Sequence, residues 1–171
     1  MKRTDSIENI LLPLADNPEQ AYLSSAVQVA DILEWIIKQL GPVKVWQTSF
    51  SISEEFLRRL YFINKKTNGI KEYTVILDFK ATNKTLSLWA FICQTIKNVY
   101  LADNHSKILL AQNEKKQTVT VITSQNLTRG NRAESAFIST SNKIFQKLKT
   151  QIDELIHEHS LTLHELYERA D

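Results

Sequence analysis

The sequence has 171 residues, 43% of them hydrophobic and 23% charged, which is the composition of a soluble globular protein and not of a disordered chain. This length suits one domain with an ordinary core, and only three Gly and three Pro argue against a turn-rich all-β sandwich. The formal net charge of +2 is too small to indicate a nucleic-acid partner, although it does not exclude one.

Hydrophobic periodicity predicts helices and strands that alternate through the first two thirds of the chain. In chain order the predicted elements are a helix over residues 24–40, a strand over 43–50, a helix up to residue 63 that Ser51 and Glu54 would cap, a strand over 73–77, a helix over 86–96, strands over 99–101, 105–111, 118–123 and 136–138, a helix over 144–156, and a short helix that Thr162 and Glu165 would cap.

This order predicts an α/β fold in which helices sandwich a mixed, largely β-α-β sheet. Residues 1–22 have no clear period, and we expect them to form an irregular lead-in. The domain itself is expected over residues 23–158, with a short C-terminal helix or tail over residues 159–171.

Cysteine usage and hydropathy bear on the compartment. Cys93 is the only cysteine, which excludes an intrachain disulfide and suits a reducing environment. The apolar stretch after the basic start is too short for a secretory signal, and no stretch approaches the ~20 apolar residues of a membrane span. We therefore expect a cytoplasmic protein that does not bind a membrane.

Residues 105–134 hold the most informative pattern. His105 and Lys107 lie two residues apart at the start of an apolar run, and Ser124 and Asn126 repeat this spacing at the end of a second run. Side chains two apart on a strand project from the same face. Two adjacent strands would thus direct a nucleophile, a cation, a hydroxyl and an amide toward one point, which suits the binding and attack of a phosphate group.

This pattern resembles the HKD signature of the phospholipase D superfamily, with the best match to its small bacterial single-motif nucleases. The matched residues are His105, Lys107, Ser124, Asn126 and Glu134. The resemblance covers roughly residues 24–158 and implies a phospholipase D-like fold. Two positions depart from the signature, because Gln112 stands where it has an aspartate and Thr123 where it has a glycine.

The resemblance also implies a role for each matched residue. His105 would be the nucleophile that forms a phosphohistidine. Lys107 and Asn126 would bind the non-bridging phosphate oxygens. Ser124 matches the serine of the signature, and Glu134 matches the acidic residue that orients the histidine.

Physical chemistry supports these roles independently. A phosphodiester is anionic, so a cation and neutral donors must withdraw charge from its oxygens before a nucleophile can attack. Lys107 supplies a point charge and Asn126 a neutral donor. Imidazole, with a pKa of about 6.5 in water, is largely unprotonated near neutral pH. Because protein groups neutralise the phosphate, we expect neither a metal nor a cofactor.

One histidine does not complete this reaction, since the leaving alkoxide needs a proton from a general acid on the far side of phosphorus. Two-motif members of the superfamily supply a second histidine from the same chain, but this sequence has one motif and no internal repeat. We therefore predict a homodimer in which His105 of each subunit faces the other across a twofold axis.

Four basic residues near the motif could bind a nucleic-acid backbone, or they could be ordinary solvated side chains. They are Lys115, Lys116, Arg129 and Arg132. The C-terminal histidines, His157, His159 and His164, have no cysteine or tight carboxylate set beside them, so a solvated helix is favoured over a metal site.

The sequence thus predicts a hydrolase, a metal-independent phosphodiesterase that is an endonuclease acting on DNA or RNA. The preference for nucleic acid follows from the resemblance and not from composition. Two alternatives stay open. One is a phospholipid-directed hydrolase or transferase with the same chemistry, although no apolar entrance or interfacial helix is evident. The other is a non-catalytic nucleic-acid-binding or regulatory module that retains the fold.

Overall fold

The computed structural model of the protein describes residues 7–170. In chain order its elements are a 3-10 helix η1 (Ile7–Asn9), β1 (Glu19–Ser24), α1 (Val29–Leu40), β2 (Val43–Thr48), α2 (Glu54–Thr67), β3 (Ile70–Asp78), a 3-10 helix η2 (Phe79–Ala81), α3 (Thr82–Leu86), α4 (Trp89–Thr95), β4 (Asn98–Ala102), β5 (Ile108–Asn113), β6 (Thr118–Thr123), β7 (Glu134–Ser139), α5 (Asn142–His159), β8 (Ser160–Thr162) and α6 (Leu163–Ala170).

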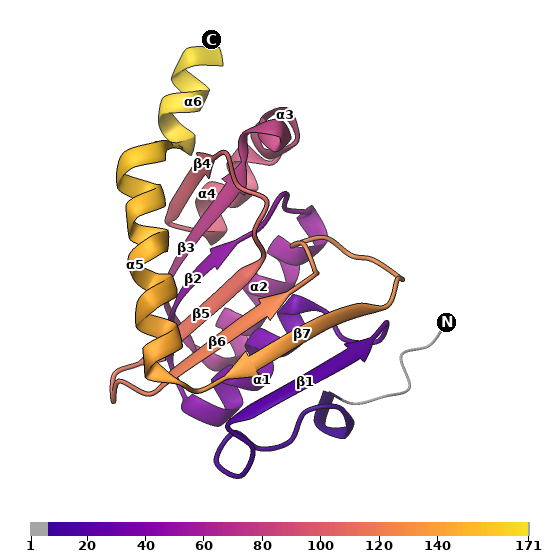
Figure 1. The fold of residues 1–171 in the computed structure, drawn as a ribbon. Helices are drawn as coiled ribbons and strands as arrows, with labels where there is room; N and C mark the ends of the chain where they lie inside the picture. The colour runs from indigo at the N-terminus through magenta and orange to yellow at the C-terminus, as the bar shows by residue number, and fades with distance from the viewer. Residues whose placement is uncertain (1–6, 171) are drawn as a thin grey trace.

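The strands form one eight-stranded sheet with the order β1-β7-β6-β5-β2-β3-β4-β8 (Figure 1). Neighbours are parallel from β2 through β3 to β4, where helical crossovers connect them, and antiparallel at every other pairing. The prediction of an α/β fold with a mixed sheet and covering helices is confirmed.

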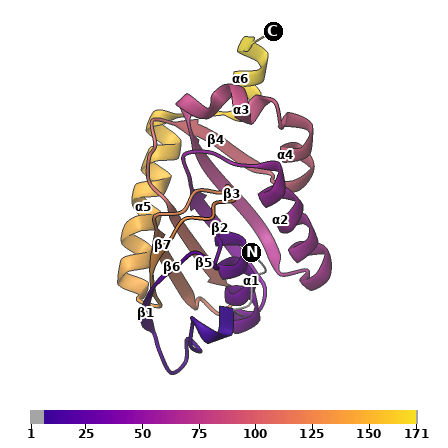
Figure 2. The same ribbon diagram turned by 90° about the vertical axis from the view of Figure 1, so that its right-hand side faces the viewer.

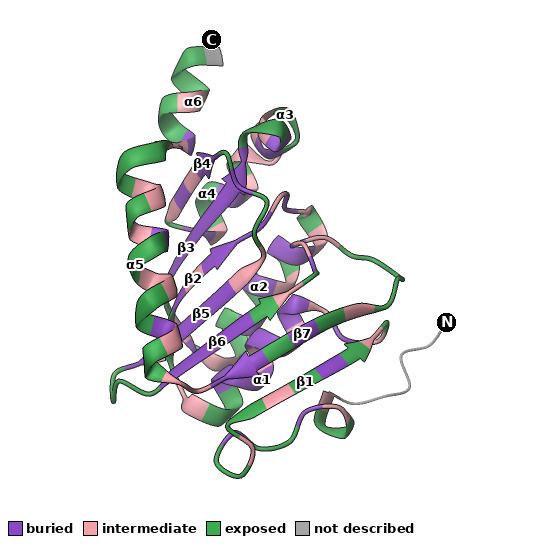
Figure 3. Ribbon diagram, in the orientation of Figure 1, coloured by how far each residue is buried: buried purple, intermediate pink, exposed green. Residues whose placement is uncertain are grey.

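Helices cover the two faces of the sheet unequally. Figure 2 shows α1, α2 and α4 on one side and α5 on the other. The larger core lies under α1, α2 and α4, and a smaller core forms where Phe145 and Ile152 of α5 pack on β2–β5. Among the described residues, no helix lies in front of β1 and β7 on the α5 side (Figure 1), while burial is concentrated in the central strands (Figure 3). One end of the sheet is therefore open on that face.

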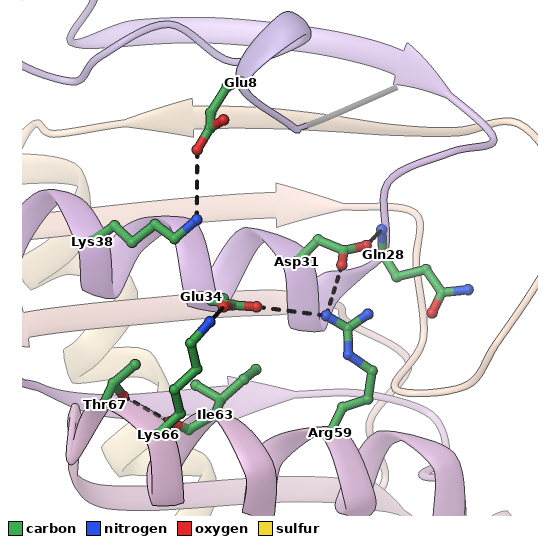
Figure 4. Close-up of polar contacts among 9 residues, drawn as sticks. All are labelled: Glu8, Gln28, Asp31, Glu34, Lys38, Arg59, Ile63, Lys66 and Thr67. Atoms are coloured by element: carbon green, nitrogen blue, oxygen red, sulfur yellow. Dashed lines mark hydrogen bonds and ion pairs between the residues drawn. The ribbon is translucent and has the colours of Figure 1, made fainter. Parts of the chain in front are cut away.

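Ion pairs connect α1 with its neighbours along the surface of the larger core (Figure 4). Arg59 of α2 lies 2.8 Å from Asp31 and 3.8 Å from Glu34, and Lys66 lies 3.5 Å from Glu34. Lys38 reaches Glu8 of η1 at 3.5 Å. Partly exposed pairs of this kind each contribute about 0–1 kcal/mol, so they align helices that apolar burial already holds.

The expectation of an irregular lead-in is wrong for residues 19–22. They belong to β1, which pairs antiparallel with β7 along its whole length. The segment before β1 is also packed, because Gln20 exchanges two hydrogen bonds of 2.9 Å with the backbone of Leu12. Residues 1–6 lie outside the described residues. At the other end of the chain, β8 joins the main sheet through β4.

Three helix boundaries differ from the predicted ones. The N-cap of α2 is Ser53, whose side chain accepts from Phe56 N at 3.3 Å, and not Ser51, which is buried. The helix predicted from residue 24 begins at Val29. The helix predicted over residues 86–96 is divided into α3 and α4.

No helix in the described residues is both long and apolar enough to cross a membrane.

Two other helix ends carry well-defined caps. Asn68 ends α2 in the left-handed conformation, with φ of 47°. Thr162 and Glu165 form the predicted capping box of α6. Hydrogen bonds that the hydroxyl and the backbone N of Thr162 donate to the carboxylate lower the pKa of Glu165, since they favour its ionised form.

Leu11 and Leu12 test whether the lead-in belongs to the domain. Leu11 is 2% exposed in the larger core, and Leu12 is 53% exposed. Leu11→Ala is expected to lower the free energy of unfolding by about 2–5 kcal/mol, because it leaves a cavity. Leu12→Ala should change it by less than about 0.5 kcal/mol. Urea denaturation followed by circular dichroism measures both, and equal effects would contradict the packing of this segment.

Candidate active site

Strand directions bring the motif residues to one edge of the sheet. The carboxyl ends of β2, β3 and β4 meet the amino end of β5, because β5 runs antiparallel to β2. The carboxyl end of β6 and the amino end of β7 lie at this same edge. The β4–β5 loop, with His105 and Lys107, and the β6–β7 loop, with Ser124 and Asn126, therefore emerge side by side (Figure 1).

The predicted strand over residues 105–111 begins three residues later than expected. His105 and Lys107 precede β5, which starts at Ile108. Backbone pairing still extends to Lys107, whose carbonyl accepts from Thr123 N at 3.0 Å. The side chain of His105 is consequently positioned by loop contacts and not by the alternation of a strand.

Asn104 anchors this loop from inside the protein. It is 5% exposed, and its Nδ2 donates to Ser49 O at 3.2 Å and to Ile76 O at 3.4 Å. Its backbone N donates to the buried carboxylate of Asp78 at 3.2 Å. The residue before His105 is thus held by the ends of β2 and β3.

Ser106 fixes the other side of His105. Its Oγ donates to Thr48 Oγ1 at 2.8 Å and to Asn104 Oδ1 at 2.6 Å, distances that allow its one proton to choose either acceptor. Thr48 Oγ1 also accepts from Ile108 N at 3.0 Å. With both neighbours restrained, the exposed His105 side chain projects from a defined backbone.

Phe50 lies between His105 and the β6–β7 loop. The rings of Phe50 and His105 meet edge to face, with centroids 5.7 Å apart and planes at 63°. The backbone N of Phe50 donates to Asn126 Oδ1 at 3.2 Å. Phe50 therefore contacts both His105 and Asn126. Lys107 is half-buried and donates from Nζ to His105 O at 2.9 Å.

The orientation of the Asn126 amide follows from its partners. Phe50 N can only donate, so the oxygen of the Asn126 side chain must face it. Ser49 Oγ lies 3.4 Å from the same oxygen. The Nδ2 donor consequently points away from both groups and is available to a ligand.

Ser124 and Glu134 form a second contact at this edge. Ser124 Oγ donates to the Glu134 carboxylate and accepts from Ser135 N at 3.1 Å. Glu134 is the first residue of β7, opposite Ser24 of β1. In this structure the carboxylate meets Ser124 and not His105, so its role toward the histidine stays a prediction.

Tyr22 lies beside Glu134 and was not anticipated from the sequence. In the β1–β7 register Tyr22 faces Ala136, two residues from Glu134, so both side chains lie on the same sheet face. Burial raises the pKa of the Tyr22 phenol well above its usual range, and the charges of Asp31 and Glu134 raise it further. Its buried hydroxyl has no hydrogen-bond partner among the described residues.

The four basic residues predicted near the motif lie at two different edges. Arg129 and Arg132 belong to the β6–β7 loop beside the site, where Arg129 forms an ion pair of 3.1 Å with Glu55. Lys115 and Lys116 lie in the β5–β6 turn, at the opposite edge. The expectation that these lysines flank the site is wrong, because the six residues of β5 carry the chain about 20 Å away.

Several positioning residues lie outside the motif. Ser49, Asp78 and Asn104 share one signal in the sequence, because each is a small polar residue at or just after the carboxyl end of a buried strand. Within residues 7–170, no group of three or more His, Cys, Asp or Glu side chains is arranged to hold a metal ion.

The fold defines a class of protein. The sequence matches no protein-family model and no curated protein. Among solved structures it is similar to Nuc, a phospholipase D family member from Salmonella typhimurium, with a TM-score of 0.61 over 84% of this chain and 96% of Nuc at 13% identity. The chain therefore has the phospholipase D-like fold.

Two other solved structures share this fold. NucT from Helicobacter pylori has a TM-score of 0.59 over 82% of this chain and 96% of its own, at 14% identity. TrmBL2, an archaeal chromatin protein described as showing a novel mode of DNA binding, has a TM-score of 0.55 at 7% identity. The match to TrmBL2 covers 90% of this chain and 58% of that protein.

Replacing Asn104 tests the anchoring of the His105 loop. Asn104→Ala is expected to lower the free energy of unfolding by about 1–3 kcal/mol, because the carbonyls of Ser49 and Ile76 lose a buried donor. Amides of residues 104–108 should also exchange hydrogen faster. Asn83→Ala, at an exposed position of α3, is the control. Equal stability losses in the two variants would contradict the anchoring role.

Proposed function

We propose that the protein is a metal-independent phosphodiesterase that cleaves DNA or RNA through a phosphohistidine on His105, at a site shared by two subunits. The proposal is carried by the contacts of Phe50 at one sheet edge, where its ring meets the ring of His105 and its backbone N donates to Asn126 Oδ1. Lys107 Nζ donates to the backbone oxygen of His105 at the same edge. The fold likeness to Nuc and NucT supports the phosphodiesterase class. With Cys93 as its only cysteine, we place the protein in the cytoplasm.

Phosphate binding falls to Lys107 and Asn126. The Lys107 ammonium now donates to a backbone carbonyl, a contact that a phosphate oxygen would replace with a charge-assisted one. Asn126 Nδ2 is the donor that its two oxygen contacts leave available. Together a cation and a neutral amide would stabilise the charge that develops on the non-bridging oxygens.

Catalysis would proceed in two displacements. His105 Nε2 attacks phosphorus and forms a P–N bond, while the P–O bond to the leaving group breaks. The leaving oxygen takes a proton from the imidazolium of the partner subunit's His105. Water then attacks phosphorus and breaks the P–N bond, and its proton passes to the partner subunit's His105, which restores both histidines.

Glu134 and Ser124 would support the histidine. A carboxylate that accepts a hydrogen bond from Nδ1–H directs Nε2 toward the substrate and stabilises the imidazolium. Glu134 is placed at the same edge, and its hydrogen bond from Ser124 limits its orientation. We assign both residues a positioning role.

An exposed apolar surface beside the site supports the homodimer. Ile122 pairs with Phe137 across β6 and β7 on the open sheet face, and they are 44% and 38% exposed. Leu23, two strands from β6 and 75% exposed, points to the same face. These side chains lie within a few residues of Ser124 and Glu134, so a partner that covers them would also approach the site.

His105→Ala tests the chemistry. The variant should lose about a thousandfold or more of the cleavage of DNA or RNA, while wild-type cleavage should persist in EDTA. His157→Ala, at an exposed position of α5, is the matched control and should keep its activity. Cleavage that disappears in EDTA would refute the phosphohistidine route. Binding without any cleavage would instead favour a nucleic-acid-binding module.

Phe137→Glu tests the shared site. A charge in an apolar interface should dissociate the dimer and abolish cleavage although His105 is intact. The control is Phe62→Glu, at an aromatic residue of α2 that is 61% exposed. Light scattering should give twice the chain mass for wild type and control and the chain mass for Phe137→Glu. A monomeric but active wild type would exclude a shared site.

A further inference from the structure

The sheet edge opposite His105 holds a lysine-lined cleft. The cleft has a volume of about 980 Å³ and lies between the first half of α5 and the amino ends of β2 and β3. Its lining includes Lys44, Lys71, Lys116 and Lys149, against the carboxylates of Glu114 and Asp153. Four lysines against two carboxylates leave this lining with a positive formal charge.

Two of these lysines are neutralised locally, and others are not. Lys149 lies 2.5 Å from Asp153 and stacks over Trp46 at 4.6 Å, and Lys44 lies 3.1 Å from Glu72. Lys71 and Lys116 of the lining, and Lys115 beside Lys116 in the β5–β6 turn, are exposed and form no ion pair with any residue of 7–170. The unpaired positive charge at this edge therefore belongs to lysines that lie at two irregularities of the backbone.

The first irregularity is a β-bulge in β3. Val43 pairs with Ile70 and Lys44 with Glu72, which leaves Lys71 as the extra residue. A bulge redirects the side chain of the residue it adds. Here the redirected side chain is that of Lys71, which lines the cleft.

The second irregularity is the β5–β6 turn, which is braced from inside. Asn113 is buried and donates from Nδ2 to Leu40 O at 2.9 Å, while its Oδ1 accepts from Gln117 N at 3.0 Å. Lys116 adopts a φ of 63°, a left-handed conformation that is unfavourable for a non-glycine residue. The braced turn thus carries Lys115 and holds the backbone of Lys116 in a strained conformation.

The first turn of α5 adds to the positive potential. The helix has 18 residues and no acidic residue in its first turn, so nothing there offsets the partial positive charge of its amino end. Its exposed Lys143 lies in this turn. A concave, positively charged surface fits a phosphodiester chain better than it fits the flat surface of a bilayer.

We propose that this lysine cleft is a second binding site for the phosphate backbone of nucleic acid, about 20 Å from His105. The inference rests on the proposed nucleic-acid substrate. Bound there, another stretch of the same polymer would be retained near the catalytic edge without contacting it. At about 3.4 Å per base pair, the separation corresponds to about six base pairs of duplex.

The test uses binding in a cleavage-deficient background. Full-length His105→Ala protein is titrated into a fluorescein-labelled duplex of about 30 base pairs, and separately into the matching RNA, at several salt concentrations. The test variant adds Lys71→Gln, Lys115→Gln and Lys116→Gln. The control adds Lys65→Gln, Lys84→Gln and Lys97→Gln, which remove the same charge from exposed positions elsewhere.

The test variant should bind at least about tenfold more weakly, with a salt slope reduced by about three, because each phosphate contact contributes about one unit. The control should change affinity less than about threefold. Equal weakening of binding in the test variant and the control would overturn the proposed role of the cleft without contradicting the proposed function. If the His105→Ala parent binds neither polymer, the proposed substrate fails as well. Loss of binding only to phosphatidylserine vesicles would assign the cleft to membranes and overturn the proposal.

Discussion

A fully buried hydroxyl at the end of β2 connects the loops on which the candidate site depends. Ser49 Oγ accepts from Leu127 N at 3.0 Å and lies 3.4 Å from Asn126 Oδ1, which joins it to the β6–β7 loop. The carbonyl of Ser49 accepts from Asn104, which joins it to the β4–β5 loop. Leaving such buried groups unpaired costs about 1–3 kcal/mol each, so the three loops are expected to move as one unit.

This shared anchoring matters because the proposed reacting groups lie in loops and not in a helix or a strand. His105 and Lys107 precede β5, and Asn126 follows β6. Phosphoryl transfer depends on positioning donors to within fractions of an ångström, which loops achieve only when buried contacts restrain them. The polar network under His105 supplies that restraint. It uses backbone carbonyls and amides, whose contacts a short sequence motif does not predict.

The sequence predicted the fold better than it predicted these contacts. Buried strands such as β3 carry a continuous apolar run, so they were found, whereas β1 buries only Tyr22 fully and shows no period. The motif predicted that His105 and Asn126 lie close together, because the order of the strands follows from the alternation of helices and strands along the chain. Contacts such as Asn104 with Ser49, 55 residues apart, have no local signature. The predicted position of Lys115 beside the site was wrong, because the six residues of β5 separate it in space from the motif residues that precede it in the sequence.

The same geometry places one departure from the HKD pattern, Gln112, away from the proposed active site. Gln112 pairs with Lys44 and Thr118 near the far edge of the sheet, where it lines the lysine cleft. A carboxylate there would face the lysines, whereas a neutral amide leaves their charge intact. Thr123, the other departure, adds a hydrogen bond of 2.8 Å to Ser135 O and holds the start of the β6–β7 loop.

The open end of the sheet lies beside the proposed active site, which lacks a general acid within one chain. A mixed sheet with one uncovered face leaves apolar side chains in water, at about 25 cal/mol for each Å² of apolar surface exposed. Ile122 and Phe137 are such side chains, and they lie within a few residues of the proposed site, where we assign one nucleophile and an anion-binding pair but no second histidine. In the proposed dimer a second copy of the chain, related by a twofold axis, would cover the apolar face and also supply the general acid. Because one partner meets both requirements, a shared site is a simpler account of this chain than an exposed patch and an incomplete motif that are unrelated.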